Sequence, residues 1–452
     1  MRPLHLLPPH GANPALQGII ALIFALSILI SNLRMTDPAE QLECYLVGGA
    51  VRDQLLGDPS IDFDWVVVGA NEDTMLKLGF SPVGRDFPVY LHPTTHQEYA
   101  LARRERKTGP GYRGFETTAS PDVTLEDDLS RRDITINAMA RSRQGKLIDP
   151  WGGATDLAAG VLRHVSAAFT EDPLRVLRVA RFAARYHDRG FGVATETQAM
   201  KQSIVTGGEL GTLPPERIWR ELSGALSAGQ PAEFFRTLRR CGALGIIFPE
   251  LDALFGVPQP QDHHPEGDAG IHTLLVLQKA AELSPDSKVR FAALVHDLGK
   301  GATPPQYWPK HIGHEKRGLK LVANMCDRLR VPTDYRRLAL QVTEYHLLMH
   351  RLETLKSQTV LKLLNRLDAF RNPNRIKNFS LACEADARGR GTGSAVDYPS
   401  AKLLQAHLQA VTALSFSDLE ATVKDDRARG REVRRRRLAA LGSVKMAWRD
   451  TT

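Results

Sequence analysis

Apolar and polar positions follow two different periodicities along the chain. Between residues 45 and 150, short apolar runs such as 61–68 and alternating stretches such as 98–103 are typical of strands. Short helical patterns separate them, which indicates a small α/β domain. Further along, the helical repeat dominates, for example in residues 213–249 and 289–300. The pattern therefore predicts an α+β protein, with a small α/β head followed by a mostly α-helical body.

Two aspartates stand in the second predicted strand, within the sequence Ile-Asp-Phe-Asp-Trp-Val-Val-Val of residues 61–68. In a strand, Asp62 and Asp64 point to the same face. Two adjacent carboxylates repel each other unless a cation lies between them, which favours a divalent metal site. An isolated Asp-x-Asp is more often a pair of solvated turn residues. The neighbouring motifs therefore have to distinguish a metal site from a solvated turn.

A glycine pair lies upstream, in the sequence Tyr-Leu-Val-Gly-Gly-Ala-Val-Arg-Asp of residues 45–53. The glycines separate a predicted strand from a predicted helix, and such a turn lets backbone N–H groups approach a phosphate. A phosphate-binding turn and a metal-binding acid pair close together in the sequence indicate phosphoryl or nucleotidyl transfer.

The order of these motifs resembles the polymerase-β-like head of class II tRNA nucleotidyltransferases (the CCA-adding enzymes) and of bacterial poly(A) polymerases. The resemblance rests on Gly-Gly-x-Val-Arg-Asp-x-Leu-Leu-Gly followed by Asp-x-Asp, on Arg-Arg-Asp-x-Thr-x-Asn-Ala at 131–138, and on Glu-Asp-x-x-Arg at 171–175. It implies that Asp62 and Asp64 are catalytic and hold two Mg²⁺ ions. It also implies a set of nucleotide-binding residues, namely Gly49, Arg52, Arg132, Asp133, Asn137, Asp172, Arg175, Arg178 and Arg181.

Residues 131–138 mix charged and apolar positions, and we expect a strand with Thr135 and Asn137 on one face. Arg132 can reach a triphosphate oxygen. Asp133 and Asn137 can hydrogen-bond a ribose hydroxyl.

The third motif opens a predicted helix, because Asp172 is a suitable N-cap and Pro173 fits the first turn. One arc of that helix then carries Arg175, Arg178, Arg181 and Arg185. A solvated basic face is the ordinary interpretation of such a stripe. The resemblance instead implies a protein template for the base, in which Asp172 accepts and Arg175 donates a hydrogen bond. Cytosine and adenine both offer an amino donor beside a ring-nitrogen acceptor, so this pair would select CTP and ATP.

Three further segments of the head have expected roles. Glu98 is a candidate third carboxylate, although a surface glutamate is the simpler interpretation. Residues 84–91 suit another strand. Residues 104–114 are basic and glycine-rich, and we expect a mobile loop there.

A second group of metal-binding residue types lies in the helical body. His272 stands in one predicted helix, and His296 with Asp297 ends another. Mixed imidazole and carboxylate ligands are typical of divalent metal sites. The Gly-Ile-His and His-Asp-Leu-Gly-Lys sequences resemble HD-type metal-dependent phosphohydrolases. This resemblance implies a site for Ni²⁺ or another divalent metal, with 2′,3′-cyclic phosphodiesterase, 2′-nucleotidase and phosphatase activities. Further candidates are the ligands His314, His346 and Asp386, and the phosphate contact Lys300.

Charge and cysteine usage indicate the kind of partner and the compartment. The 452 residues carry a formal net charge of +8, which suits a polyanionic partner without establishing one. Four cysteines lie singly along the chain, which argues against disulfides and fits the cytoplasm. An arginine run at 434–437 is either a solvated helix face or a contact to RNA phosphates.

The almost wholly apolar segment 16–30 conflicts with that location. It is shorter than the ~20 residues of a membrane-spanning helix, and no clear cleavage pattern follows it. We expect translation to begin at Met35, with a signal-anchor and a core helix as alternatives. We expect no stable membrane partner.

These features predict five segments. They are an apolar extension (1–34), a nucleotidyltransferase head (35–160), a helical neck and nucleotide-selecting region (161–257), an HD domain (258–370) that opens on a linker (258–270), and a helical tRNA-binding tail (371–452). The resemblance implies template-independent addition of CCA to tRNA from CTP and ATP, with repair of tRNA ends by the HD domain; a homodimer is also considered. Three alternatives stay open: a poly(A) polymerase, an RNA-binding protein with a non-catalytic head, and a protein in which only the HD hydrolase is active.

Overall fold

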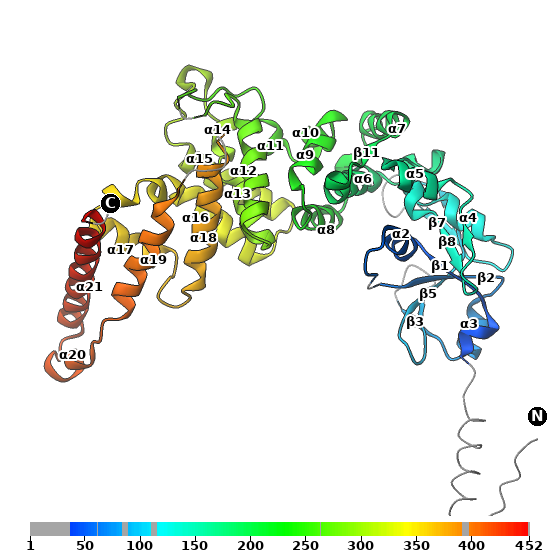
Figure 1. Ribbon diagram of the computed structural model, residues 1–452, viewed down its shortest axis with the longest axis horizontal. Helices are drawn as coiled ribbons and strands as arrows, with labels where there is room; N and C mark the ends of the chain where they lie inside the picture. Colours follow the sequence, from blue (N-terminus) through cyan, green and yellow to red (C-terminus); the bar gives the residue numbers. More distant parts are fainter. Residues whose placement is uncertain are drawn as a thin grey trace, which may run out of the picture. The chain divides into compact units, whose positions relative to one another are not determined.

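The computed structural model describes residues 37–450, apart from 61, 84–88, 110–114, 263 and 391–396. The apolar segment 16–30 and the expected start at Met35 lie outside the described residues, as do the start of the predicted strand at 84–91 and the tip of the predicted loop at 104–114. The chain divides into two compact units, one built on a sheet and one almost wholly helical (Figure 1). No described helix has the length and apolar character needed to cross a membrane.

The sheet unit contains a seven-stranded mixed sheet in the order β3-β4-β5-β2-β1-β8-β9. Its strands are β1 (Glu43–Val47), β2 (Asp64–Val68), β3 (Ser81–Val83), β4 (Val89–Leu91), β5 (Glu98–Leu101), β8 (Ala140–Ser142) and β9 (Leu147–Ile148). Neighbouring strands are antiparallel, except that β2 and β5 are parallel. Two further strands, β6 (Arg104–Lys107) and β7 (Phe115–Thr118), form a separate ribbon.

Hydrophobic cores cover both faces of this sheet. Val67 of β2 packs in the core that includes Met75 of α3 (Glu72–Lys77). Val66 packs in the other core, with Leu129 of α4 (Leu125–Ser130). Because successive side chains of a strand point to opposite faces, a strand buried on both sides is continuously apolar. This explains the uninterrupted apolar run after Asp64.

The helical unit contains residues 106–116, 130–138 and 149 onward. Its first helices are α5 (Gly153–Ala159), α6 (Leu174–Tyr186), α7 (Thr195–Thr206), α8 (Pro215–Leu226), α9 (Pro231–Arg240), α10 (Ala243–Ile247) and α11 (Pro249–Asp252). The HD region follows with α12 (Ala269–Leu283), α13 (Ser287–Val295), α14 (Leu298–Gly301), α15 (His314–Arg328), α16 (Thr333–His350), α17 (Ser357–Arg366) and α18 (Asn374–Arg388). The last helices are α19 (Pro399–Thr412), α20 (Ser417–Thr422) and α21 (Asp426–Arg449). A short ribbon pairs β10 (Val161–Leu162) with β11 (Gly192–Val193).

Within the helical unit, the arginine-bearing helix α6 and the HD motif lie in separate groups of packed helices. Helix α6 packs on α8 and α9. Helices α12, α13, α16 and α18 pack together around the HD motif (Figure 1). The predicted α+β class is confirmed, with a sheet-containing head and a mostly helical body.

The strand predicted at 131–138 is wrong: Thr135–Asn137 form a 3₁₀ turn. Asp133 Oδ1 accepts hydrogen bonds from the Ile134 N–H at 2.9 Å and from Asn137 Nδ2 at 3.1 Å. Side-chain bonds of this kind give the backbone an alternative to a strand ladder. The Thr135 N–H donates to the Arg163 carbonyl at 2.8 Å, which ties this segment to the helical unit.

Candidate active sites

In the sheet unit, the glycine turn and the first aspartates lie at the same end of two neighbouring strands. Strands β1 and β2 are antiparallel, and Val47 pairs with Asp64. Gly48 follows Val47 with φ 69° and ψ −127°, a conformation that favours glycine, and α2 (Gly49–Leu56) begins directly after it. The register therefore places the start of α2 next to the start of β2.

A third carboxylate joins this end of the sheet. Asp64 is aligned with Glu98 on the parallel neighbour β5. Adjacent strands lie about 4.8 Å apart, and aligned residues point to the same face. The side chains of Asp62, Asp64 and Glu98 are all exposed. Asp62 lies just before β2 rather than within it. Carboxylate oxygens are the ligands that a hard divalent cation prefers.

Arg52 lies beneath the glycine turn. Its side chain is 5% exposed, and its Nη2 atom lies 2.8 Å from Asp53 Oδ1. A Cβ atom added at Gly49 would come within 3.4 Å of the same Nη2 atom. Because Gly49 has no Cβ atom, the guanidinium group of Arg52 can pack against the turn.

In the helical unit, the Arg-Arg-Asp motif is held by an ion pair between the buried Asp133 and the partly exposed Arg178. Arg178 of α6 lies 2.7 Å from Asp133 Oδ2. Burial raises the pKa of Asp133, but the charge of Arg178 and the hydrogen bonds from Asn137, Arg178 and Ile134 outweigh it and hold that pKa at about 2. Arg132 donates to the Asn137 carbonyl at 3.4 Å. The structure thus brings Arg132, Asp133, Asn137 and Arg178 together.

The Glu-Asp-x-x-Arg motif is fixed by main-chain and cross-helix contacts. Arg175 is 8% exposed and donates to the carbonyls of Ala168, at 2.6 Å, and of Arg131. Asp172 accepts from the Leu174 N–H at 3.0 Å and from Arg217 at 2.9 Å. The predicted arc of arginines is therefore not a uniformly solvated face.

Two residues of α8 that sequence reasoning missed hold this motif. Arg217 binds Asp172, and Glu221 accepts a hydrogen bond of 2.6 Å from Arg181. Nothing in the local sequence around Glu-Asp-x-x-Arg signals either partner, because both lie about 40 residues further along the chain.

The HD motif is the centre of a buried cluster drawn from six helices. His272 lies on α12, His296 ends α13, and Asp297 precedes α14. The cluster is completed by His314 on α15, His346 on α16 and Asp386 on α18. Each of these six residues is at most 7% exposed. The structure therefore brings together the three ligands named from the motif and the three further candidates.

Within this cluster, short distances separate the side chains of His272, His296, Asp297 and Asp386. His272 Nε2 lies 3.1 Å from Asp386 Oδ1, and His296 Nε2 lies 3.2 Å from Asp297 Oδ2. His296 Nε2 and Asp297 Oδ1 are buried atoms that form no hydrogen bond with described residues. Buried polar atoms normally have a partner. Imidazole and carboxylate groups at this spacing fit a divalent transition metal.

Three residues around this cluster were not singled out from the sequence. Glu266 Oε1 lies 2.8 Å from His272 Nδ1 and 3.0 Å from His264 Nδ1. His350 Nε2 lies 2.6 Å from Asp386 Oδ2. His264 and Glu266 belong to the segment interpreted as a linker, whose proline and glycine content hid their role. Such outer contacts fix the orientation of metal ligands.

A cavity of about 630 Å³ opens beside the HD cluster. Asp297, His314, His346 and Asp386 line it together with basic residues, namely Lys300, Lys310, Arg351 and Arg390. Lys300 Nζ lies 2.6 Å from Asp297 Oδ2. The basic lining suits an anionic substrate that approaches the carboxylates and histidines.

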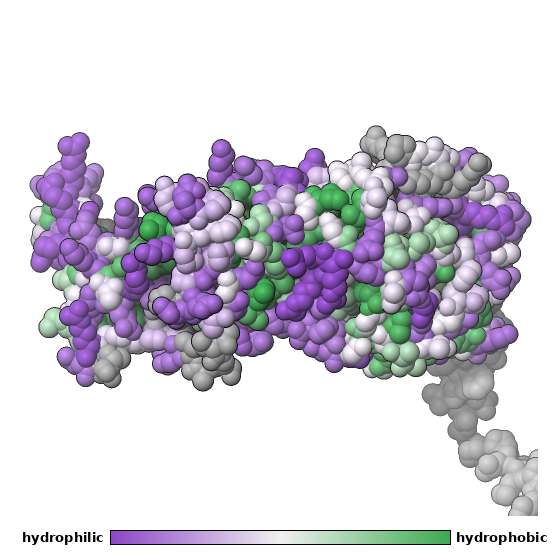
Figure 2. All heavy atoms as spheres, turned by 90° about the horizontal axis from the view of Figure 1, so that it is seen from above, coloured by the Kyte–Doolittle hydropathy of each residue, from purple (hydrophilic) through white to green (hydrophobic). Residues whose placement is uncertain are grey.

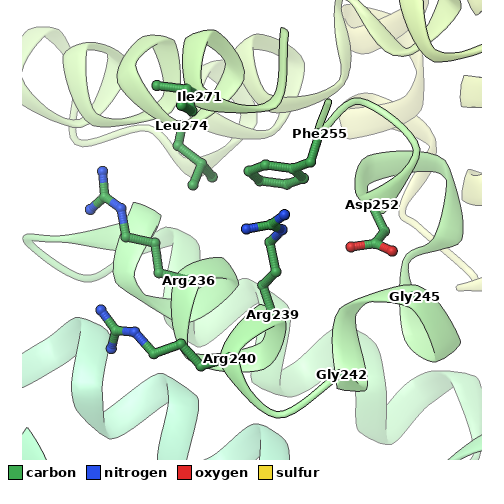
Figure 3. Close-up of a pocket in the computed structure, with 9 residues that line it drawn as sticks. All are labelled: Arg236, Arg239, Arg240, Gly242, Gly245, Asp252, Phe255, Ile271 and Leu274. Atoms are coloured by element: carbon green, nitrogen blue, oxygen red, sulfur yellow. The ribbon is translucent and has the colours of Figure 1, made fainter. Parts of the chain in front are cut away.

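A second cavity of about 630 Å³ lies among α9, α10, α11 and α12. It is basic on one side, where α9 contributes Arg236, Arg239 and Arg240. Figure 3 shows the guanidinium group of Arg239 beneath the ring of Phe255, and the two are 4.2 Å apart. Stacking on an aromatic ring holds a guanidinium group in place while leaving its edge available to an anion.

Two of the four arginines in the run at 434–437 pair with carboxylates. On α21, Arg435 and Arg436 pair with Glu432, and Arg436 also pairs with Asp418. Arg437 lies 4.3 Å from the ring of Phe370.

On the face drawn in Figure 2, hydrophilic residues predominate and hydrophobic residues form small separate groups. A polar surface of this kind suits a polar partner better than an apolar one.

Three family models match the chain. They are described as the poly A polymerase head domain (residues 44–163), the probable RNA and SrmB-binding site of polymerase A (190–255) and the HD domain (270–372). The structure is similar to that of a CCA-adding enzyme in its apo form II, with a TM-score of 0.60, 19% identity, and coverage of 96% of this chain and 93% of that chain. A complex of a CCA-adding enzyme with ATP gives a TM-score of 0.59 at 19% identity, covering 95% of this chain and 90% of that chain. At these identities, the solved structures show the shared fold.

Two relatives establish the family. A multifunctional CCA protein of Nitrosococcus oceani is 56% identical over 400 residues, which are 88% of this chain and 98% of the relative. A multifunctional CCA protein of Thioalkalivibrio sulfidiphilus is 56% identical over 407 residues, 90% of this chain and all of the relative. The chain therefore belongs to the multifunctional CCA protein family: it is a CCA-adding nucleotidyltransferase that also carries an HD domain.

Proposed function

We propose that this protein adds C, C and A to the 3′ end of tRNA from CTP and ATP without a nucleic-acid template. The observation that carries the proposal is the end of the sheet where Asp64 is aligned with Glu98 and lies beside the glycine turn. Metal-binding carboxylates next to a phosphate-binding turn are what nucleotidyl transfer requires.

Asp62, Asp64 and Glu98 are the residues that would hold two Mg²⁺ ions. Bound Mg²⁺ supplies Lewis acidity, which favours a 3′-oxyanion and neutralises charge on the leaving pyrophosphate. The N–H of Gly49 opens α2 and would donate to a triphosphate oxygen, while Arg52 beneath the turn adds positive charge.

The helical unit would supply nucleotide selection. Arg132 and Arg178 would contact the triphosphate, and the Asp133 carboxylate holds Arg178 in place. Asp172 would accept from the amino group shared by cytosine and adenine, while Arg175 would donate to the ring nitrogen. Arg217 and the main-chain carbonyls that bind these two side chains would keep them in a fixed orientation.

The HD cluster would hydrolyse phosphoesters at damaged tRNA ends. We propose 2′,3′-cyclic phosphodiesterase, 2′-nucleotidase and phosphatase activities with Ni²⁺ or another divalent metal. His272, His296, Asp297 and Asp386 would hold the metal, which supplies an activated water when bound. The basic residues Lys310, Arg351 and Arg390 at the cavity support an anionic substrate.

We place the protein in the cytoplasm. All four cysteines are buried free thiols, which suits a reducing compartment. Translation from Met35 stays an expectation of the sequence.

The decisive experiment uses a tRNA that lacks its CCA end. With labelled CTP alone, we expect two CMP residues to be added before the reaction stops, because the third residue of the CCA end has to come from ATP. Later addition of ATP should add one AMP. Products are resolved at single-nucleotide length on a denaturing gel.

The same gel distinguishes the rivals. A long A tail from ATP alone would indicate a poly(A) polymerase and contradict the proposal. No incorporation, with retained tRNA binding, would indicate a non-catalytic RNA-binding head.

A basic cavity on α9 is the proposed contact for the tRNA backbone, supported by the RNA-binding family model that matches residues 190–255. The double variant Arg236→Ala/Arg239→Ala should weaken tRNA binding about tenfold at physiological salt. The slope of log K against log salt should fall by about 2, because two phosphate contacts are lost. Fluorescence anisotropy with labelled tRNA across a salt series measures both quantities.

Arg371→Ala is the matched control, because Arg371 lies elsewhere in the helical unit and its side chain is 88% exposed. It should leave the salt slope unchanged. An equal loss in both variants would show that only net charge matters, and would remove the assignment of the cavity.

A further inference from the structure

An isoleucine is exposed in the cavity beside the HD cluster. Ile312 lines this cavity and is 79% exposed, the highest value among the large hydrophobic residues that the structure describes. Leaving an aliphatic side chain in water is unfavourable in proportion to its exposed area. Single exposed apolar residues are common on protein surfaces, so the surroundings of Ile312 distinguish an ordinary surface residue from a ligand contact.

Hydrogen bonds hold the chain on both sides of Ile312. Arg317 of α15 donates to the Ile312 carbonyl at 2.9 Å and to the Thr303 hydroxyl at 2.8 Å. The preceding residue, His311, is 1% exposed, has a φ of 47°, and bonds the Pro258 carbonyl through its Nε2 atom at 2.8 Å. A positive φ is uncommon for residues other than glycine and persists where the surrounding contacts hold it. The loop therefore keeps Ile312 in its exposed position.

The lining of the cavity combines apolar and basic side chains. Pro309 and Leu347 are apolar lining residues like Ile312, and of these two Pro309 is exposed and Leu347 is half-buried. Lys310 and Arg351 add positive charge to the same cavity. A ligand that suits such a lining has an anionic group and an apolar face.

A nucleotide has both features. Its phosphate is anionic, and its base has a flat π-face that packs against side chains without regard to sequence. The cavity volume of about 630 Å³ lies within the range of roughly 300–1,000 Å³ that is typical of sites for small molecules and cofactors. Inorganic phosphate or a small phosphate ester would leave Ile312 uncovered.

We propose that Ile312, together with Pro309 and Leu347, forms the contact surface for the nucleobase of the hydrolase substrate. Because these side chains contact the face of a base and not its hydrogen-bonding edge, the surface discriminates little among the four bases. It selects nucleotides, including the terminal nucleotide of an RNA, over small phosphate esters. The inference rests on the proposed hydrolase function for its use in catalysis, whereas binding of the base is tested without catalysis.

Methyl NMR of the full-length, chelator-stripped protein tests the binding of the base. The isoleucine δ1 methyl groups are labelled with ¹³C, and the Ile312 signal is assigned by its loss in Ile312→Val. Adenosine, which has a base but no phosphate, should shift this signal upfield, because the methyl group then lies over the face of the purine ring. The signal of Ile246, which is 40% exposed on α10, should stay in place. An unchanged Ile312 signal at millimolar adenosine would overturn the proposal.

The kinetic test uses the full-length protein loaded with Ni²⁺. Ile312→Ser should raise the KM for 2′-AMP about tenfold with little change in kcat, because apolar contact to the base is lost in the ground state and the transition state alike. The KM for glycerol 2-phosphate, which has no base, should rise by less than about twofold.

Ile246→Ser is the matched control, because it removes an exposed isoleucine elsewhere in the helical unit. It should retain the parent KM for both substrates. An equal rise for both substrates in Ile312→Ser, or an unchanged KM for 2′-AMP, would overturn the assigned base contact.

The two experiments separate the two levels of inference. A shifted Ile312 signal in a parent protein that hydrolyses neither substrate would retain the base contact and contradict the proposed hydrolase function. Hydrolysis of both substrates with an unshifted signal would retain the function and overturn the base contact.

Discussion

Asp64→Asn is expected to lower the rate of CMP addition to a tRNA lacking CCA by about 1,000-fold, which corresponds to ~4 kcal/mol of transition-state stabilisation. Asp64 is the carboxylate that the register places between Val47, at the glycine turn, and Glu98 on the neighbouring strand. Asparagine keeps the size of the side chain but removes the charge that a divalent cation requires. Single-turnover incorporation of labelled CMP at saturating Mg²⁺ measures the effect.

Asp73→Asn is the matched control, because Asp73 is an exposed aspartate in the first turn of α3 of the same unit. It should retain nearly full activity. Hydrolysis of a 2′-nucleotide by the HD domain should be unchanged in both variants, which shows that the chain is folded. An Asp64→Asn protein that keeps more than about one tenth of the CMP-addition rate would remove the assigned role of the acid pair.

Gly299→Ala is expected to destabilise the helical unit by about 3 kcal/mol and to abolish HD-dependent hydrolysis. A Cβ atom at residue 299 would lie 1.9 Å from the His314 carbonyl oxygen and 2.7 Å from the Gly318 nitrogen. Both contacts are with backbone, so α14 and α15 must move apart. His314, the first residue of α15, would then leave the cluster. Urea unfolding followed by circular dichroism at 222 nm measures the stability.

Gly430→Ala provides the opposite control. Gly430 lies within α21, and no described atom beyond its chain neighbours and the nearby backbone of that helix lies within 4 Å of an added Cβ. Alanine in a helix is favoured over glycine by roughly 0.5–1 kcal/mol, so this variant should be slightly more stable. If Gly299→Ala unfolds at the same urea concentration as the parent protein, the close approach of α14 and α15 is not a requirement of the fold.

Local patterns account for much of the sheet unit. The apolar run at 61–68 indicated a strand, and β2 forms there and packs in two cores. The glycine pair indicated a turn between strand and helix, and Gly48 has a positive φ there. Both features depend on residues next to each other in the chain, which is why periodicity reveals them.

Local patterns were misleading where side chains bind the backbone. The mixed segment at 131–138 suggested a strand, but Asp133 bonds the Ile134 N–H and Asn137, so a turn forms instead. Similarly, the proline- and glycine-rich segment near 264 suggested a linker, yet it carries Glu266 to His272. Composition does not show such contacts, because each depends on where another element lies.

By itself, the sequence determined the family and the α+β class, because these depend on motifs and on hydrophobic periodicity. Only the tertiary structure decided that Glu98 is aligned with Asp64, that Glu221 and Arg217 hold the arginine helix, and that His314 and His346 face the second oxygen of Asp297. Strand register and helix packing bring together residues separated by tens of positions, and no spacing in the chain encodes the distance between them.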